Sequence, residues 1–117
     1  MTRIIVTGSR NYAWGLVWAT LNQALADLGP FTLVVGDCPT GADDHARAWA
    51  EKTGTTCEVY TANWAQHGKA AGPIRNRAMV LAGADLVLAF PLGTSRGTRD
   101  CMAAARNAGI PVKEIAP

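Results

Sequence analysis

The sequence predicts an α/β fold: a Rossmann-like, three-layer open sheet of about five parallel strands with helices on both faces. Short apolar runs alternate with segments whose apolar residues recur at three- and four-residue steps. Three of the runs are nearly continuous in Ile, Val and Leu, which is typical of strands buried on both faces. The segments that follow the strands are rich in Gly, Ser, Thr and Arg. The connections from each helix to the next strand are short and show no such enrichment in Ser and Arg.

Five short apolar runs are the predicted strands, and four helical segments separate them. The strands cover residues 3–7, 31–36, 56–60, 85–90 and 111–115. A strand, a crossover helix and a second strand form the right-handed unit of a parallel sheet. The order of elements therefore predicts a single parallel sheet within one domain, residues 1–117.

The predicted helices rest on apolar periodicity and on their end signals. The periodic residues are Trp14, Trp18, Leu21, Leu25 and Leu28 in the first helix, Ala42, Ala46, Trp49 and Ala50 in the second, and Ile74, Ala78 and Leu81 in the third. A fourth, alanine-rich helix covers about residues 99–108 and ends at Gly109. Residues 61–71 show no such pattern and are predicted to form a long loop that contains Trp64.

The composition of the chain limits the classes of partner that it can bind. The formal net charge is +2, which is too mild to indicate nucleic-acid binding. Eight of the 11 basic residues are Arg, which suits bidentate recognition of phosphate or carboxylate. No apolar stretch approaches the ~20 residues of a membrane span, and no signal-peptide pattern precedes the first strand. We therefore expect a cytoplasmic protein without a membrane partner.

The cysteines and histidines do not predict a metal site. Cys38, Cys57 and Cys101 are odd in number and form no C-x-x-C pair, so a disulfide or a zinc site is not expected. His45 and His67 have no partners at metal-ligand spacing. We expect neither a metal nor another cofactor.

Ligands of open parallel sheets bind beyond the carboxyl ends of the strands, and the unusual residues of this chain fall there. The candidate ligand-binding residues are Gly8, Ser9, Arg10, Gly36, Asp37, Thr40, Gly41, Asp43, Trp64, Arg75, Asn76, Pro91, Gly93, Thr94, Ser95, Arg96, Gly97 and Thr98. Gly8 permits a sharp turn and a close approach of ligand to backbone. Thr40 and Asp43 have two interpretations, a helix capping box or a ligand contact, and both stay open.

Two further segments suggest an anion site. Arg75 lies in the first turn of a helix that contains Pro73, where a cation is unfavourable for the helix dipole. Its position indicates a phosphate contact, with a solvated arginine as the alternative. Residues 93–98, GTSRGT, can present successive N–H groups and hydroxyls at a helix N-terminus. This segment matches neither the Walker A loop nor the G-x-G-x-x-G fingerprint.

The tryptophans divide into two groups. Trp64, in the predicted loop, either stacks on a base or covers the core. Trp14, Trp18 and Trp49 lie on helical stripes and indicate core or subunit interface. A homodimer is expected, because apolar helical faces on so small a domain leave surface that a partner would cover.

Taken together, the segments GSR (8–10), GDCPTGAD (36–43), AGPIRNRAM (71–79) and ADLVLAFPLGTSRGTRD (84–100) resemble the YspA-like branch of the SLOG superfamily. This superfamily also contains the Lonely Guy phosphoribohydrolases and DNA-processing protein A. The resemblance covers about residues 3–113 and implies a Rossmann-like sheet with a nucleotide-type ligand above it. Against the hydrolase motifs, Arg75 and Met79 match, Asn76 replaces a lysine, and the glutamate position falls on Cys101, next to Asp100.

Three functions follow as hypotheses. The first is a sensor or binding module for a small molecule of the ADP-ribose, NAD or nucleoside-phosphate type. The second is an N-glycoside hydrolase similar to the Lonely Guy enzymes, with Asp100 and Arg75 as the catalytic candidates and Asp37 or Asp43 as further carboxylates. The third is single-stranded DNA binding, which predicts a basic groove and a strong salt dependence.

Overall fold

The five predicted apolar runs all form strands of one sheet. In the computed structural model, which describes residues 2–117, the sheet order is β3-β2-β1-β4-β5 and every pair is parallel. The near-continuous runs form the three central strands, where both faces are covered. The strands are β1 (Arg3–Gly8), β2 (Thr32–Gly36), β3 (Cys57–Tyr60), β4 (Leu86–Phe90) and β5 (Val112–Glu114).

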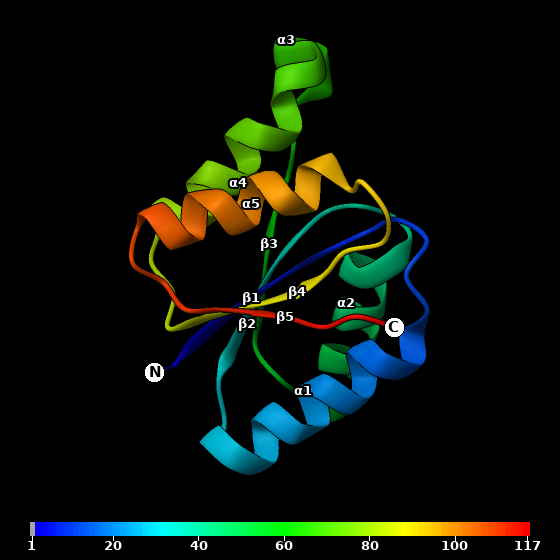
Figure 1. The fold of residues 1–117 in the computed structure, drawn as a ribbon. Coiled ribbons are helices and arrows are strands. Elements are labelled where there is room, and N and C mark those ends of the chain that lie inside the picture. The colour runs from blue at the N-terminus through cyan, green and yellow to red at the C-terminus, as the bar shows by residue number, and fades with distance from the viewer. Residues whose placement is uncertain (1) are drawn as a thin grey trace.

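The helices pack in two layers on opposite faces of the sheet, as the fold class predicts. Helices α1 (Trp14–Leu28) and α2 (Gly41–Thr53) contact each other on one face. Helices α4 (Ala71–Leu81) and α5 (Arg96–Asn107) contact each other on the opposite face. Figure 1 shows the sheet nearly edge-on between the two layers. Right-handed crossovers produce this division, because the chain moves outward from β1 to β3 and then returns to the other side of β1.

The alternation of side chains along each strand divides the core into two clusters. Ile4 and Val6 of β1 pack with α1 and α2, whereas Ile5 packs on the side of α4 and α5. Trp49 is fully buried in the first cluster and stacks on Phe31, with ring centroids 5.7 Å apart. Burial of both sheet faces explains why these strands show no alternation of apolar and polar residues.

The prediction of a loop over residues 61–71 was wrong. The segment contains α3 (Trp64–His67) and the 3-10 turn η1 (Gly68–Ala70), and η1 runs directly into α4. Asn63 begins α3, because its side chain accepts a hydrogen bond from the Gln66 amide at 3.0 Å. Gly68, with φ +55°, ends it. A helix of four residues is too short to show apolar periodicity, and the sequence therefore gave no sign of it.

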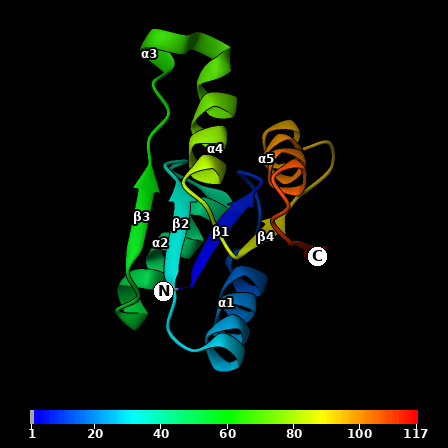
Figure 2. The same ribbon diagram turned by 90° about the vertical axis from the view of Figure 1, so that its left-hand side faces the viewer.

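Helix α3 lies beyond the carboxyl ends of the strands, where it extends the molecule. In Figure 2 the strand arrows point upward and α3 sits above their tips. Trp64 is its first residue and is 50 % exposed. None of the helices in residues 2–117 combines the length and the apolarity that a membrane span requires.

Candidate functional site

The site lies where the winding of the sheet reverses, between β1 and β4. The connection after β1 runs to one face and the connection after β4 to the other, so the loops diverge and leave a crevice. A cleft of about 1290 Å³ opens at this carboxyl edge. The predicted site residues that line it are Gly8, Ser9, Arg10, Asp37, Thr40, Asp43, Trp64, Arg75, Asn76, Ser95, Arg96, Gly97, Thr98 and Asp100.

Two glycines let the loops around the cleft pack closely. A Cβ on Gly8 would lie 2.9 Å from both Cβ and O of Phe90, so only glycine fits where β1 meets β4. Gly41 has φ +70°, and a Cβ there would lie 2.6 Å from Cα of Arg10. The start of α2 therefore rests on the backbone of the β1–α1 loop.

A chain of hydroxyl groups connects the two loops at the switch point. The Leu92 amide donates to Ser9 Oγ at 2.7 Å, and Ser9 Oγ lies 2.7 Å from Ser95 Oγ. Ser95 Oγ in turn donates to Thr98 Oγ1 at 2.7 Å. Since Ser95 has one hydroxyl proton, Ser9 must donate to Ser95 in this arrangement. The chain thus runs in one direction and ends at Thr98, in the first turn of α5.

Ser95 combines this contact with an uncommon backbone. Its φ is +41°, and it is the one non-glycine residue among residues 2–117 with positive φ. Such a conformation costs about 1–2 kcal/mol for an L-residue and persists where surrounding contacts hold it. It turns the chain so that α5 begins at Arg96, with the first N–H groups of the helix beside the cleft. Those groups have no acceptor within the helix and attract anions.

Arg75 is held at the floor of the cleft by two hydrogen bonds. Its Nη1 donates to Asp37 Oδ1 at 3.0 Å, and its Nε donates to Asn76 Oδ1 at 2.8 Å. Asn76 is buried and also donates to the Gly97 carbonyl at 3.2 Å, which links α4 to α5. The Arg75 side chain is only 13 % exposed. Arg75 is therefore not a solvated arginine: part of its charge is already paired within the chain.

Asp43 is a second carboxylate on the same arginine. Burial raises the pKa of Asp43 to about 6, and the nearby positive charge of Arg75 limits that rise. The capping-box interpretation is not confirmed, because Thr40 begins α2 without any side-chain capping hydrogen bond. Asp43 instead accepts a hydrogen bond from the backbone of Cys38.

Gly36, the last residue of β2, makes room for this cluster. A Cβ on Gly36 would lie 2.7 Å from Asp43 Oδ2 and would also collide with the Arg75 guanidinium. The two side chains therefore pack against bare backbone. Gly36 does not line the cleft but supports the residues that do.

Asp100 lines the cleft from α5, and its carboxylate is poorly paired. Its Oδ2 is buried without a hydrogen-bond partner, and its Oδ1 lies 3.9 Å from Arg77 Nη2. A buried polar atom without a partner is rare, since desolvation is then uncompensated. The next residue, Cys101, is fully buried, and burial raises the pKa of its thiol to about 11.

The rim of the cleft is basic where the floor is acidic. Arg10, Lys69 and Arg96 are exposed, line the opening, and form no ion pair with any residue of the described chain. The carboxylates of Asp37 and Asp43 lie deeper, beside Arg75. The cleft therefore offers free cations near solvent, and carboxylates and hydroxyls below.

Not every predicted residue reaches the cleft. Pro91 is buried, and the carbonyls of Gly93 and Thr94 accept hydrogen bonds from the Arg99 guanidinium, both at 3.0 Å. The cleft-lining residues that the sequence did not single out are Val6, Thr7, Asn11, Cys38, Pro39, Lys69, Gly72, Pro73, Met79 and Leu92. Lys69 was missed because its segment was predicted to be a long loop before the third helix, in which only Trp64 was a candidate. Thr7 and Cys38 could have been predicted from the sequence, because each lies next to the carboxyl end of a predicted strand.

No group of three or more His, Cys, Asp or Glu residues within residues 2–117 is placed to hold a metal ion. The donors at the cleft are hydroxyls, amides and guanidinium groups, which suit an organic anion.

The sequence profile of the YspA, cpYpsA-related SLOG family matches residues 2–67, more than half of the chain. The chain belongs to this family. It is also similar to the Gene 61 protein of Mycobacterium phage D29, with 48 % identity over 124 aligned residues, covering 96 % of this chain and 94 % of that protein. The matched part of this SLOG protein contains the whole β1–α1 and β2–α2 half of the cleft.

Proposed function

We propose that the cleft of this SLOG protein binds a nucleotide-derived small molecule, of the ADP-ribose, NAD or nucleoside-phosphate type, as a sensor or binding module. The supporting observation is the polarity of the cleft, with unpaired cations at the rim and carboxylates and hydroxyls at the floor. A nucleoside phosphate has the matching division into an anionic end and a hydroxyl-rich end. Family membership supports the same class of ligand.

The phosphate end would lie on the first turn of α5. The N–H groups of that turn and the guanidinium of Arg96 would face the phosphate oxygens, with Arg10 on the opposite rim. Ribose hydroxyls would donate to the carboxylates on the floor, and the exposed ring of Trp64 would stack on the base. Arg75 would act mainly by positioning Asp37 and Asp43, because its contacts are already made.

Titration calorimetry with ADP-ribose, NAD and AMP tests this proposal. We expect Arg96→Ala to weaken binding by about tenfold, the loss of one charge-assisted contact to phosphate. Arg106→Ala is the matched control, because Arg106 lies in the last turn of the same helix, and it should change the dissociation constant by less than about twofold. Equal effects of the two variants, or no binding of any of the three compounds, would argue against the cleft as a nucleotide site.

Asp100 Oδ2, which has no hydrogen-bond partner, favours a second function, hydrolysis of the N-glycosidic bond of a nucleoside monophosphate. In that reaction water adds to C1′, the bond from C1′ to the base nitrogen breaks, and the base leaves with a proton. A carboxylate either activates the water or stabilises the positive charge that develops at C1′. Asp100 Oδ2 has the free acceptor capacity for this role.

A proton NMR time course with AMP separates the two functions. Broadening of the ribose H1′ signal without its loss over a day supports a binding module. Loss of that signal, with appearance of free base, supports the hydrolase, and Asp100→Asn should then slow base release by at least about a hundredfold. An unchanged rate in this variant would exclude Asp100 as the catalytic carboxylate.

A further inference from the structure

One part of the sheet lacks a helix on the side of α1. Helices α1 and α2 cover β1, β2 and β3 on that side and bury Leu88 and Phe90 of β4, whereas none of the helices in residues 2–117 covers β5 there. Leu86, Leu88 and Lys113 point from β4 and β5 to this side, since Leu88 and Lys113 are register partners. A groove of about 400 Å³ remains between these strands and α1.

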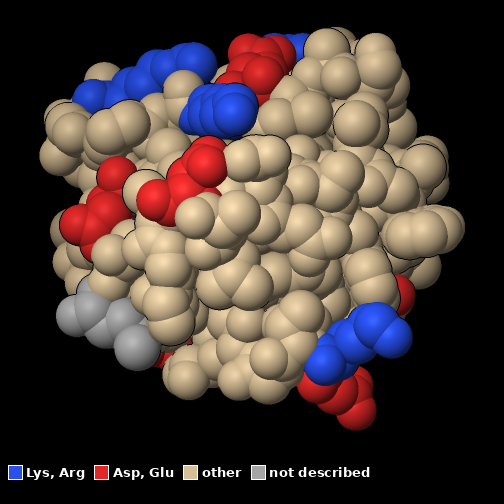
Figure 3. Space-filling model, turned by 90° about the horizontal axis from the view of Figure 1, so that it is seen from below, with Lys and Arg blue, Asp and Glu red and all other residues tan. Residues whose placement is uncertain are grey.

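Helix α1 is an unusual surface helix. Only one of its 15 residues, Asp27, is charged. Its large apolar side chains are also on the surface: Trp14 is 60 % exposed, Leu16 40 % and Leu28 51 %. A helix that faces water on one side normally carries charged and polar residues there. Figure 3 views the molecule from the side of α1 and shows a broad uncharged area with charged residues mainly toward its edges.

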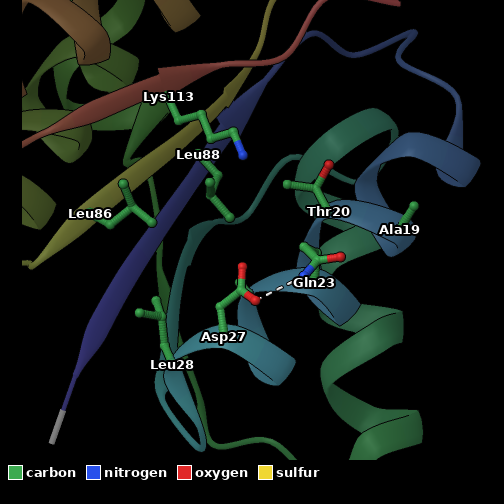
Figure 4. Close-up of a pocket in the computed structure, with 9 residues that line it drawn as sticks. Ala19, Thr20, Gln23, Asp27, Leu28, Leu86, Leu88 and Lys113 are labelled. Carbon is green, nitrogen blue, oxygen red and sulfur yellow. Dashed lines mark hydrogen bonds between the residues drawn. The ribbon is translucent and has the colours of Figure 1, made fainter.

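The groove and the helix beside it therefore form one continuous surface. Figure 4 shows the walls of the groove, with Ala19, Thr20, Gln23, Asp27 and Leu28 from α1 on one side and Leu86, Leu88 and Lys113 from the strands on the other. The Asp27 carboxylate and the Lys113 amine approach from opposite walls. Gln23 Nε2 donates to Asp27 Oδ1 at 2.9 Å, and neither charge forms an ion pair within the described chain.

We propose that this surface binds a second copy of the chain, in a two-fold symmetric contact that places α1 of each protomer in the groove of the other. A two-fold interface is self-complementary, so one surface must supply both a ridge and a matching hollow. Here the ridge is α1 and the hollow is the neighbouring groove, where a helix would extend the layer over β5.

The charges that line the groove favour a second copy of the chain, rather than an unrelated protein, as the molecule that binds there. When α1 of the partner enters the groove, it brings the partner's Asp27 toward Lys113 on the far wall, and the symmetry repeats the contact. Each protomer thereby pairs the one charge of α1 and the one cation of the groove. The rest of the groove lining is uncharged and includes three leucines, and depletion of charge is typical of the core of a homodimer interface.

Sedimentation equilibrium of the wild-type chain tests the association. We expect twice the chain mass of 12.3 kDa at concentrations of roughly 100 µM, corresponding to a dissociation constant in the micromolar range or below. Leu28→Arg and Ala19→Glu change exposed groove residues and should raise the dissociation constant at least tenfold. Leu81→Arg is the matched control, because Leu81 is 86 % exposed at the end of α4 in the other layer, and it should leave the dimer intact.

A charge exchange tests the two-fold geometry itself. Asp27→Lys and Lys113→Asp should each weaken the dimer about tenfold, because each places like charges across the interface. The double variant restores opposite charges at both contacts and should return to within about threefold of wild type. Circular dichroism and thermal unfolding of each variant separate loss of association from loss of folding.

Three outcomes would overturn the proposal. A wild-type chain that stays monomeric at roughly 100 µM removes the second copy as the occupant of the surface. A dimer that tolerates Leu28→Arg and Ala19→Glu but is lost in Leu81→Arg has its interface on the side of α4. A dimer that both single charge variants leave unchanged does not bring Asp27 to Lys113.

Discussion

At the scale of single residues, the environment of Asp43 decides its chemistry. The residue is 6 % exposed and sits where a carboxylate loses its hydration, yet Arg75 faces it. Burial dominates, so the pKa rises to about 6. The same residue in an exposed first turn of a helix would be an ordinary acid that stabilises the helix dipole. The type of residue was visible in the sequence, but its protonation state follows from packing.

The raised pKa of Asp43 makes stability depend on pH. The folded chain holds the Asp43 proton more tightly than the unfolded chain, whose ordinary value is 3.8. Stability from this group is therefore present below about pH 4 and is lost as the pH rises through about 6. We expect Asp43→Asn to stabilise the protein at pH 7.5 by up to about 3 kcal/mol relative to wild type, and hardly at pH 4.

Urea unfolding at pH 4, 5, 6 and 7.5 measures this difference. Asp44→Asn is the control, because Asp44 is half exposed and pairs with Arg47 at 3.3 Å on the surface, and it should change stability by less than about 1 kcal/mol throughout. A constant offset between Asp43→Asn and wild type across the range would show that Asp43 does not titrate there.

At the scale of elements, one side chain connects three of them. Arg75 belongs to α4, Asp37 follows β2, and Asp43 lies in the first turn of α2. Asn76 extends the connection to Gly97 at the start of α5. Because α2 and α4 lie on opposite faces of the sheet, the cluster joins the two helix layers at the carboxyl edge, beside the cleft. Gly36 is part of the same arrangement, since its missing side chain leaves the space that Arg75 and Asp43 occupy.

Removing the cation from this cluster should destabilise the fold in a pH-dependent way. Arg75→Met leaves Asp37 and Asp43 close together without their counter-charge, which we expect to cost about 2 kcal/mol or more at pH 8. At pH 5 the loss should be smaller, because Asp43 is then largely protonated. Urea unfolding at the two pH values gives the comparison.

The neighbouring arginine supplies the control for this experiment. Arg77→Met changes a side chain that is 62 % exposed and lies 3.9 Å from Asp100, and it should cost less than about 1 kcal/mol at either pH. If Arg75→Met and Arg77→Met proved equally mild, the buried cluster would contribute nothing to stability.

At the scale of the whole molecule, the winding of the sheet determines which residues come together at the cleft. The loops after β1 and β4 are more than 80 residues apart in sequence, yet Ser9 and Ser95 share a hydrogen bond of 2.7 Å. The same winding leaves the α1 side of β5 without a covering helix. The cleft and the proposed dimer surface are thus both consequences of the reversal of the winding after β3.

Two cysteines differ in how accessible the fold leaves them. Cys38 lines the cleft, whereas Cys101 is fully buried and its thiol pKa is raised to about 11 by burial. We expect iodoacetamide to label Cys38 of the native protein at least about tenfold faster than Cys101. A bound nucleotide should slow labelling of Cys38 and leave Cys101 unchanged. Peptide mass spectrometry of timed samples measures both rates, and comparable labelling of Cys101 would contradict the packing of α5 on β1.

The sequence alone determined the α/β class, because hydrophobic burial dictates both the near-continuous strands and the helical periodicity. It also predicted which edge carries the polar loops. It could not predict α3, because a single turn capped by Asn63 leaves no periodic pattern. Nor could it determine the role of Thr40, whose capping signature is not used in the fold.

Only the tertiary structure decided which candidate residues stand together. Arg75 is half of a partly buried ion pair rather than a solvated cation, and Asp100 lines the cleft while Cys101 points into the core. On a helix, one residue turns the side chain by about 100°, so a motif match cannot say which of two neighbours faces the ligand. Local composition fixes which elements form, whereas contacts between residues far apart in sequence fix the charge, the burial and the direction of each side chain.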